Sequence, residues 1–177
     1  MFNRFYPDEW VNSTYDIDFE KMYRRGFRGV IFDIDNTLVP HGAPADDRAE
    51  ALFKRLREIG INSVLLSNND HDRVDMFNKN IGTNVICKAS KPSKKGYRKA
   101  MEIMGTTELN TFTVGDQLFT DMWGASNAGL YCILVKPIHP KEEIQIILKR
   151  RLEAVVLFFY KRKVRREEKR KEKRKQQ

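Results

Sequence analysis

Short apolar runs alternate with longer segments of helical periodicity along most of this chain. Runs rich in β-branched residues and bounded by turn residues are typical of buried strands. They predict strands at Val30–Ile34, Ser63–Leu66, Asn84–Cys87, Thr111–Val114 and Cys132–Val135. Apolar residues spaced three or four apart predict helices between them. These helices span Asp46–Ile59, Asp70–Asn80, Ser93–Met104 and Phe119–Asn127, and a shorter one is expected at Asp18–Arg25.

Strands that alternate with helices of this length favour a parallel sheet built from right-handed βαβ units. We therefore predict an α/β protein with a three-layer, Rossmann-like fold, in which helices cover both faces of a parallel sheet. The length of 177 residues suits one domain of this kind. We assign the domain to residues 29–160, and expect residues 1–28 to form an extension that packs on the edge of its core.

The last predicted helix, Glu142–Tyr160, has two interpretations. It begins amphipathic and becomes apolar on every side from Ala154, a run far shorter than the roughly 20 residues that cross a bilayer. The helix either docks on the sheet or lies with an exposed apolar face and basic flanks in an anionic membrane surface. The pattern leaves both open.

The net charge of +9 is concentrated in a tail at residues 161–177. This tail holds 11 of the 33 Lys and Arg residues and 3 of the 24 Asp and Glu residues, so the rest of the chain is nearly neutral. Such a run predicts a disordered basic extension that meets anionic partners, and not a basic globular surface.

The two cysteines indicate a reducing compartment. Cys87 and Cys132 each lie in an apolar segment, and Met1–Trp10 shows no signal peptide. Two buried, reduced thiols in a cytoplasmic protein are therefore expected in place of a disulfide.

Polar side chains suited to chemistry follow four successive predicted strands. Each has an ordinary structural explanation when taken alone, such as a helix cap for Ser67 or an exposed lysine for Lys91. Their shared position is harder to explain separately, because α/β sheets bind ligands at the carboxyl ends of their strands. The residues are Asp33 and Asp35, then Ser67, then Lys91, and then Asp116 with Asp121.

Asp33 and Asp35 are expected to converge on one small space, because the second carboxylate falls in the loop beyond the strand. Two like charges at short distance raise each other's pKa unless a cation neutralises them. The pair therefore calls for a divalent metal or a shared proton.

Four segments together resemble the four motifs of the haloacid dehalogenase (HAD) superfamily of phosphatases. They are Asp33-Ile34-Asp35-Asn36-Thr37, Ser67, Lys91 and Gly115-Asp116-Gln117-Leu118-Phe119-Thr120-Asp121. The resemblance spans residues 29–135. Within the superfamily, the segments are most similar to the YqeG-type branch of subfamily IIIA, which is itself similar to phosphatidylglycerophosphate phosphatases.

The resemblance implies a phosphomonoester hydrolase that works through an aspartyl-phosphate. Asp33 is then the nucleophile, while Asp35 acts as general acid and later as general base. Lys91 neutralises charge on the phosphoryl group and on Asp33. The residues implied to orient this loop and bind the substrate are Thr37, Ser67 and Asn68.

The resemblance also implies a metal site. Its ligands are Asp33, Asp116 and the main-chain carbonyl of Asp35, and Asp121 supports the metal or orients Lys91. Oxygen ligands, with open positions for water and a phosphate, favour Mg²⁺ over zinc. Asp35 is then left to exchange its proton.

The spacing of the motifs leaves no room for a cap domain, since Thr37–Ser67 and Ser67–Lys91 each hold only one helix and one strand. An uncapped site cannot by itself enclose a small metabolite, so a bulky substrate or a partner subunit is expected to cover it. A phosphorylated anionic phospholipid meets this demand, and the resemblance implies phosphatidylglycerophosphate. The basic tail would hold the protein peripherally on the inner face of the membrane, without a transmembrane segment.

Two alternatives stay open at this point. One is a phosphatase for nucleic-acid ends or phosphoproteins, which a basic tail would also serve, although no aromatic residue follows Tyr160 to stack on bases. The other is a non-catalytic module that docks on RNA or ribosomes. The retained Asp33, Asp35, Lys91 and Asp116 argue against it, because a binding module has no use for these mutually repelling groups.

Overall fold

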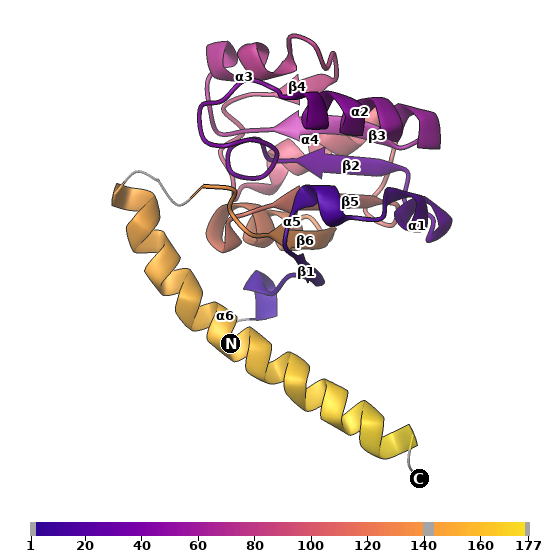
Figure 1. Ribbon diagram of the computed structural model, residues 1–177, viewed down its shortest axis with the longest axis vertical. Coiled ribbons are helices and arrows are strands. Elements are labelled where there is room, and N and C mark those ends of the chain that lie inside the picture. Colours follow the sequence, from indigo (N-terminus) through magenta and orange to yellow (C-terminus); the bar gives the residue numbers. More distant parts are fainter. Residues whose placement is uncertain (1–2, 140–143, 176–177) are drawn as a thin grey trace.

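The computed structural model describes residues 3–139 and 144–175. Its centre is a parallel sheet of six strands in the order β1-β6-β5-β2-β3-β4 (Figure 1). The strands are β1 (Glu9–Val11), β2 (Gly29–Phe32), β3 (Asn62–Leu66), β4 (Asn84–Ile86), β5 (Thr111–Gly115) and β6 (Tyr131–Val135). The helices are α1 (Phe19–Arg24), α2 (Asp47–Ile59), α3 (His71–Asn78), α4 (Lys94–Met104), α5 (Trp123–Asn127) and α6 (Ile144–Lys175). Short helical turns are η1 (Asn3–Phe5), η2 (Thr14–Asp16) and the π-helical η3 (Leu118–Met122).

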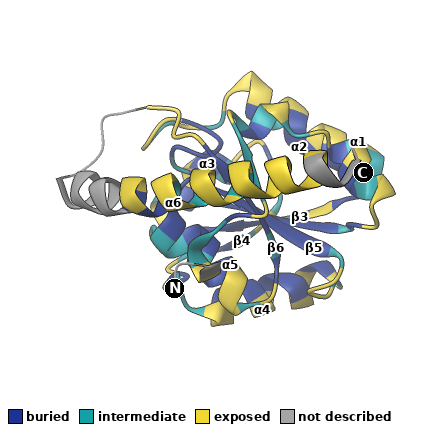
Figure 2. Cartoon of the chain, turned by 90° about the horizontal axis from the view of Figure 1, so that it is seen from below, coloured by how far each residue is buried: buried dark blue, intermediate teal, exposed yellow. Residues whose placement is uncertain are grey.

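Helices cover both faces of the sheet, which confirms the predicted three-layer α/β fold. Alternate residues of β2 point to opposite faces, so Val30 and Phe32 pack under α1, α2 and α3, whereas Ile31 packs under α4 and α5. Figure 2 shows the buried strands between helices whose outer surfaces are exposed. No cap domain is inserted between these elements in the part of the chain that the structure describes.

Polar residues set the helix starts where the sequence predicts them. The side chains of Asp18, Asp46, Asp70 and Ser93 each accept a backbone N–H from the first turn of α1, α2, α3 and α4. These bonds satisfy amides that have no partner within the helix. The expected starts at these four residues therefore correspond to N-caps.

The two ends of the chain differ from expectation. Residues 9–11 form an edge strand parallel to β6. The sequence does not predict this strand, because its three residues are too few and too mixed in polarity to form a pattern. The tail expected to be disordered from residue 161 instead continues α6 as one helix to Lys175. Lys, Arg and Glu are good helix formers, and Lys163 pairs with Glu167 at 4.0 Å one turn on. The expected helix start at residue 142 lies outside the described residues.

The order of the strands reverses at β2. The chain runs from β2 outward to β3 and β4, and then returns to β5 on the other side of β2. Ligands bind to α/β sheets at such a reversal, outside the carboxyl ends of the strands. The carboxyl ends of β2 and β5 are therefore where a site is expected.

Candidate active site

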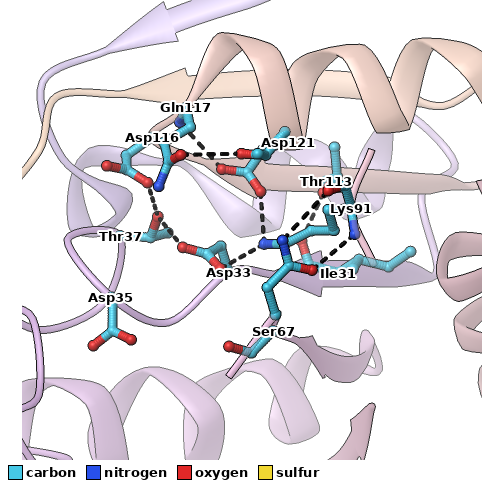
Figure 3. Close-up of polar contacts among 12 residues, drawn as sticks. Ile31, Asp33, Asp35, Thr37, Ser67, Lys91, Thr113, Asp116, Gln117 and Asp121 are labelled. Carbon is cyan, nitrogen blue, oxygen red and sulfur yellow. Dashed lines mark hydrogen bonds and ion pairs between the residues drawn. The ribbon is translucent and has the colours of Figure 1, made fainter. Parts of the chain in front are cut away.

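Most of the predicted site residues lie together at this edge of the sheet, whereas Asp35 does not converge with Asp33 as expected (Figure 3). Asp33 directly follows β2, Ser67 follows β3 and Asp116 follows β5, while Lys91 reaches in from the loop between β4 and α4. Four segments that are far apart in sequence thus supply one constellation, as the sequence predicts.

Lys91 bridges two carboxylates. Its Nζ lies 2.6 Å from Oδ1 of Asp33 and 2.7 Å from Oδ1 of Asp121. Burial raises the pKa of Asp33 to about 6, against the lowering effect of Lys91 and with a further raising effect of Asp121. Burial lowers the pKa of Lys91, but the charges of Asp121 and Asp33 outweigh it and move that pKa upward. The lysine is therefore held as an ammonium ion.

Three of the predicted metal ligands form a cluster. Each of Asp33, Asp116 and Asp121 offers a carboxylate oxygen, and these oxygens lie within 4.8 Å of one another. Buried carboxylates at this distance repel, and one ammonium group offsets only part of their charge. An all-oxygen donor set with excess negative charge fits a hard divalent cation such as Mg²⁺. The carboxylate of Asp35 is not part of this cluster, so its expected role as a ligand rests on its main-chain carbonyl.

Thr37 joins the two halves of the cluster. Its hydroxyl lies 3.4 Å from Oδ2 of Asp33 and 3.4 Å from Oδ1 of Asp116. The hydroxyl of Thr14 in turn donates to the carbonyl of Thr37 at 2.7 Å, and that of Tyr15 donates to the carbonyl of Leu38 at 2.7 Å. The N-terminal segment therefore holds the loop that follows β2, a role that the sequence does not suggest.

Gly115 allows Asp121 to enter the site. A Cβ atom at Gly115 would lie 2.5 Å from Cβ and 2.6 Å from Cγ of Asp121, which no side chain tolerates. Asp121 is held further by the N–H of Gln117, 3.1 Å from its Oδ2, and by the hydroxyl of Tyr97, which donates to its carbonyl at 3.1 Å. Glycine at this position is thus required by a close approach of side chain to backbone.

Asp35 points away from the cluster of Asp33, Lys91 and Asp121 (Figure 3). Its carboxylate accepts hydrogen bonds from Arg73, with Nη2 at 2.7 Å, from the N–H of Gly42 at 2.8 Å, and from the amide of Asn69. Burial raises the pKa of Asp35, but the bonds from Arg73 and Gly42 outweigh it and hold the pKa below its usual value.

Arg73 and Asn69 were not predicted as site residues. One signal for Arg73 was present: it lies in the first turn of α3, where the helix dipole disfavours a cation unless a carboxylate is near. Asn69 follows Ser67 in the loop, but its contact with Asp35 depends on the path of that loop and leaves no pattern in the sequence.

Ser67 and Asn68 shape the loops around the site. The hydroxyl of Ser67 is buried and accepts the N–H of Asn69 at 3.1 Å, while Asp70 caps α3. The side chain of Asn68 accepts the N–H of Lys91 at 2.7 Å and donates to the carbonyl of Lys91 at 3.3 Å. Asn68 therefore holds the main chain of Lys91, and its expected contact with the substrate stays a prediction.

Comparison with known proteins agrees with this constellation. A family model described as HAD-hydrolase-like matches residues 88–144. The "Probable phosphatase YqeG" of Bacillus subtilis is 36% identical over 160 residues, which cover 90% of this chain and 93% of that protein. The chain belongs to the YqeG-type HAD phosphatases. The resemblance seen in the four motifs is thereby confirmed.

Two further proteins are similar to this HAD phosphatase, one in sequence and one in fold. This chain is 32% identical over 168 residues to "Phosphatidylglycerophosphate phosphatase 1, chloroplastic/mitochondrial" of Arabidopsis thaliana, and it spans 48% of the length of that relative. A solved structure of a "putative HAD superfamily (subfamily III A) hydrolase" from Legionella pneumophila matches with a TM-score of 0.50 and 16% identity, over 64% of this chain and 68% of the other. The latter similarity shows a shared fold.

Proposed function

We propose that this HAD phosphatase hydrolyses phosphomonoesters with Mg²⁺ through a covalent aspartyl-phosphate on Asp33. The observation that carries the proposal is the position of Asp33, whose carboxylate is bound by Lys91 at 2.6 Å and belongs to the carboxylate cluster with Asp116 and Asp121. A carboxylate is ionised at neutral pH and forms a labile acyl phosphate, so it suits a transient nucleophile.

In the first step, a carboxylate oxygen of Asp33 attacks phosphorus and the bond from phosphorus to the ester oxygen breaks. Asp35 donates a proton to the departing oxygen. Arg73 and Asn69 hold Asp35 as a carboxylate, so it must leave them, take up a proton from solvent and turn toward Asp33 before it can donate.

In the second step, a water molecule attacks phosphorus while Asp35 removes one of its protons. The bond between phosphorus and Asp33 breaks, inorganic phosphate leaves, and both aspartates return to their starting states.

Charge neutralisation would come from Lys91 and from a bound cation. Lys91 offsets charge on the phosphoryl oxygens and on Asp33, and the hydroxyl of Ser67 and the Thr37 and Asn68 loops orient the phosphoryl group. Asp33, Asp116, Asp121 and the main-chain carbonyl of Asp35 would hold Mg²⁺, which supplies Lewis-acid stabilisation of phosphoryl oxygens when bound.

For the substrate, we propose phosphatidylglycerophosphate at an anionic membrane surface, converted to phosphatidylglycerol and phosphate. The name of the Arabidopsis relative and the uncapped site support it. The basic side chains of α6 would add a surface for anionic lipid, and they flank a shallow hollow of about 500 Å³. It is lined by Phe158, Lys161, Arg162, Arg165, Arg166 and Lys169. Each Lys or Arg near an anionic leaflet contributes about 1 kcal/mol to binding.

Within the described residues, no helix has an apolar stretch long enough to cross a bilayer. We therefore propose that α6 attaches peripherally, with an aromatic side chain at the membrane surface and its basic side chains facing lipid phosphates.

A side-by-side assay decides the substrate. Phosphate release with Mg²⁺ is measured on phosphatidylglycerophosphate in mixed micelles, phosphorylated oligonucleotides, a phosphopeptide and sugar phosphates. We expect the lipid to be preferred. A preference for oligonucleotides or phosphopeptides would support the alternative class of substrate, and a preference for sugar phosphates would contradict the argument from the uncapped site.

Sedimentation with anionic vesicles tests the attachment. The full chain is compared with a chain that ends at Tyr160, and we expect only the full chain to pellet with the vesicles. Unchanged binding of the shorter chain would show that the basic part of α6 is not the anchor.

A further inference from the structure

Helix α6 presents two different faces. Glu153 and Val156, three residues apart, are both only 4% exposed and lie against the core. Val155 and Phe158 are 52% and 61% exposed, and basic residues follow them in the sequence. One face of α6 is therefore seated on the domain, while the other offers apolar and cationic groups to a partner.

The buried carboxylate of Glu153 is bound to the segment that carries the metal site. Its Oε1 accepts the N–H of Leu118 at 2.8 Å and lies 3.4 Å from the N–H of Phe119. These are the first residues of η3, and the N-cap residue Gln117 makes no capping bond with its own side chain. A carboxylate from α6 thus satisfies amides at the start of a helix, where the backbone dipoles favour negative charge.

The segment that Glu153 binds is linked directly to two proposed metal ligands. Leu118 lies two residues after Asp116, and η3 contains Asp121, whose side chain fills the space left by Gly115. Asp121 in turn binds Lys91 at 2.7 Å. A displacement of Leu118 would therefore move two proposed metal ligands and the lysine that contacts the nucleophile.

Other contacts of α6 run to the N-terminal segment. The ring of Tyr160 lies 5.3 Å from that of Tyr6, and Nζ of Lys161 lies 4.8 Å from the ring of Trp10. These aromatic and cation–π contacts at the surface are individually weak. A partner that binds the outer face of α6 would therefore strengthen the packing of this helix on the domain.

We propose that Glu153 couples the binding of α6 on an anionic bilayer to the geometry of the metal site. When the outer face of α6 rests on lipid, Glu153 is held against Leu118 and Phe119, and the segment with Asp116 and Asp121 is fixed for metal binding. Glu153 is a positioning residue, since it acts through the loop and touches neither metal nor substrate. The bilayer part rests on the proposed function above.

The test compares Glu153→Ala, Glu153→Gln and the control Glu168→Gln, which removes the same charge from an exposed position of α6. Mg²⁺ binding is measured by calorimetry and protection of the Leu118 and Phe119 amides by hydrogen exchange, each with and without phosphatidylglycerol vesicles. Thermal melts establish that each variant is folded. Loss of supporting contacts to metal ligands typically weakens metal binding about 10- to 100-fold.

We expect vesicles to tighten Mg²⁺ binding and protect both amides in the unmodified chain and in Glu168→Gln. Glu153→Ala should bind Mg²⁺ about tenfold more weakly and lose the vesicle response while still pelleting with vesicles, and Glu153→Gln, which keeps an acceptor oxygen, should fall between. Unchanged affinity and exchange in Glu153→Ala, or a persistent vesicle response, would overturn the coupling. Phosphate release from the soluble substrate p-nitrophenyl phosphate is scored separately, so a failure of the phosphatase proposal is distinguishable from a failure of the coupling.

Discussion

Lys91 and Asp33 form a buried ion pair, with Nζ and Oδ1 2.6 Å apart, in which the same ammonium group also contacts Asp121. The pair joins the proposed nucleophile, which follows β2, to a loop that follows β4. It also sets the charge of the site, because the remaining negative charge is what attracts a divalent cation.

Replacement of Lys91 by Met should lower turnover about 100- to 1,000-fold, because the developing charge on the phosphoryl group loses its partner. The metal-free variant should also be less stable by about 3–5 kcal/mol, since buried carboxylates are left without their cation. Urea unfolding with and without Mg²⁺ checks this, and Mg²⁺ should restore part of the loss. The exposed Lys99→Met serves as the control, and an equal effect there would contradict the assignment.

Replacement of Arg73 by Ala should raise the pKa of Asp35, because Arg73 is the main group that keeps it low against the effect of burial. An acid that must donate a proton in the first step and accept one in the second then titrates at higher pH. Because Asp35 must hold a proton when the first step begins, we expect the alkaline limb of the pH profile of kcat/KM to move upward, with little change in Mg²⁺ affinity. The exposed Arg98→Ala should leave the profile unchanged. An unmoved limb in Arg73→Ala would show that the contact with Asp35 has no part in turnover.

Replacement of Gly115 by Ala should disrupt the metal site, because its Cβ would lie 2.5 Å from Cβ of Asp121. Asp121 must move, so Mg²⁺ binding should weaken about 10- to 100-fold. The matched control is Gly105→Ala at the end of α4, where φ is +65° and no atom lies within 4 Å of the added methyl group. It should cost about 1 kcal/mol of stability through backbone strain and leave Mg²⁺ affinity intact. Equal Mg²⁺ affinities in the two variants would refute this role of Gly115.

Mg²⁺ binding should depend on pH around the pKa of Asp33. In the folded, metal-free protein this pKa is raised to about 6, so below pH 6 a proton competes with the cation for the carboxylate. The apparent affinity should fall about tenfold per pH unit below 6 and level off above it, with proton release on binding. Calorimetry in buffers of different ionisation enthalpy measures both. A flat profile between pH 5 and 7 would exclude Asp33 as a ligand.

The raised pKa of Asp33 also affects the stability of the metal-free protein. Between about pH 4 and pH 6 the unfolded chain loses the proton that the folded protein keeps. The free energy of unfolding should therefore decrease as the pH rises through this window. The contribution is fully present below pH 4 and lost above pH 6. Urea unfolding of the metal-free protein at these pH values tests the sign.

Much of the fold and of the central site could be predicted from the sequence. Asp33, Ser67 and Asp116 directly follow strands, and the parallel arrangement brings strand ends together whatever the details of packing. The starts of four helices could also be predicted, because each depends on a capping side chain that accepts an N–H from the first turn of the helix next to it.

The contacts that the sequence does not reveal depend on how distant elements pack. Arg73 meets Asp35 only because α3 is rotated toward the loop after β2, and Thr14 supports Thr37 only because the N-terminal segment crosses that loop. Glu153 is unusual in the sequence as a single carboxylate in an apolar stretch of helix. Its partners could not be predicted, because they are the backbone amides of Leu118 and Phe119, which the sequence pattern does not mark. The cysteines are free, as expected, although Cys87 is only half-buried.

Trapping the covalent intermediate tests most directly whether Asp33 is the nucleophile. The protein is mixed with Mg²⁺ and a substrate that carries a radioactive phosphoryl group, quenched in acid within the first turnover, digested and sequenced by mass spectrometry. We expect label on the peptide that contains Asp33, removable by hydroxylamine as an acyl phosphate, and neither label nor phosphate release in Asp33→Asn. Phosphate release by Asp33→Asn at the rate of the unmodified protein would show that Asp33 is not the nucleophile.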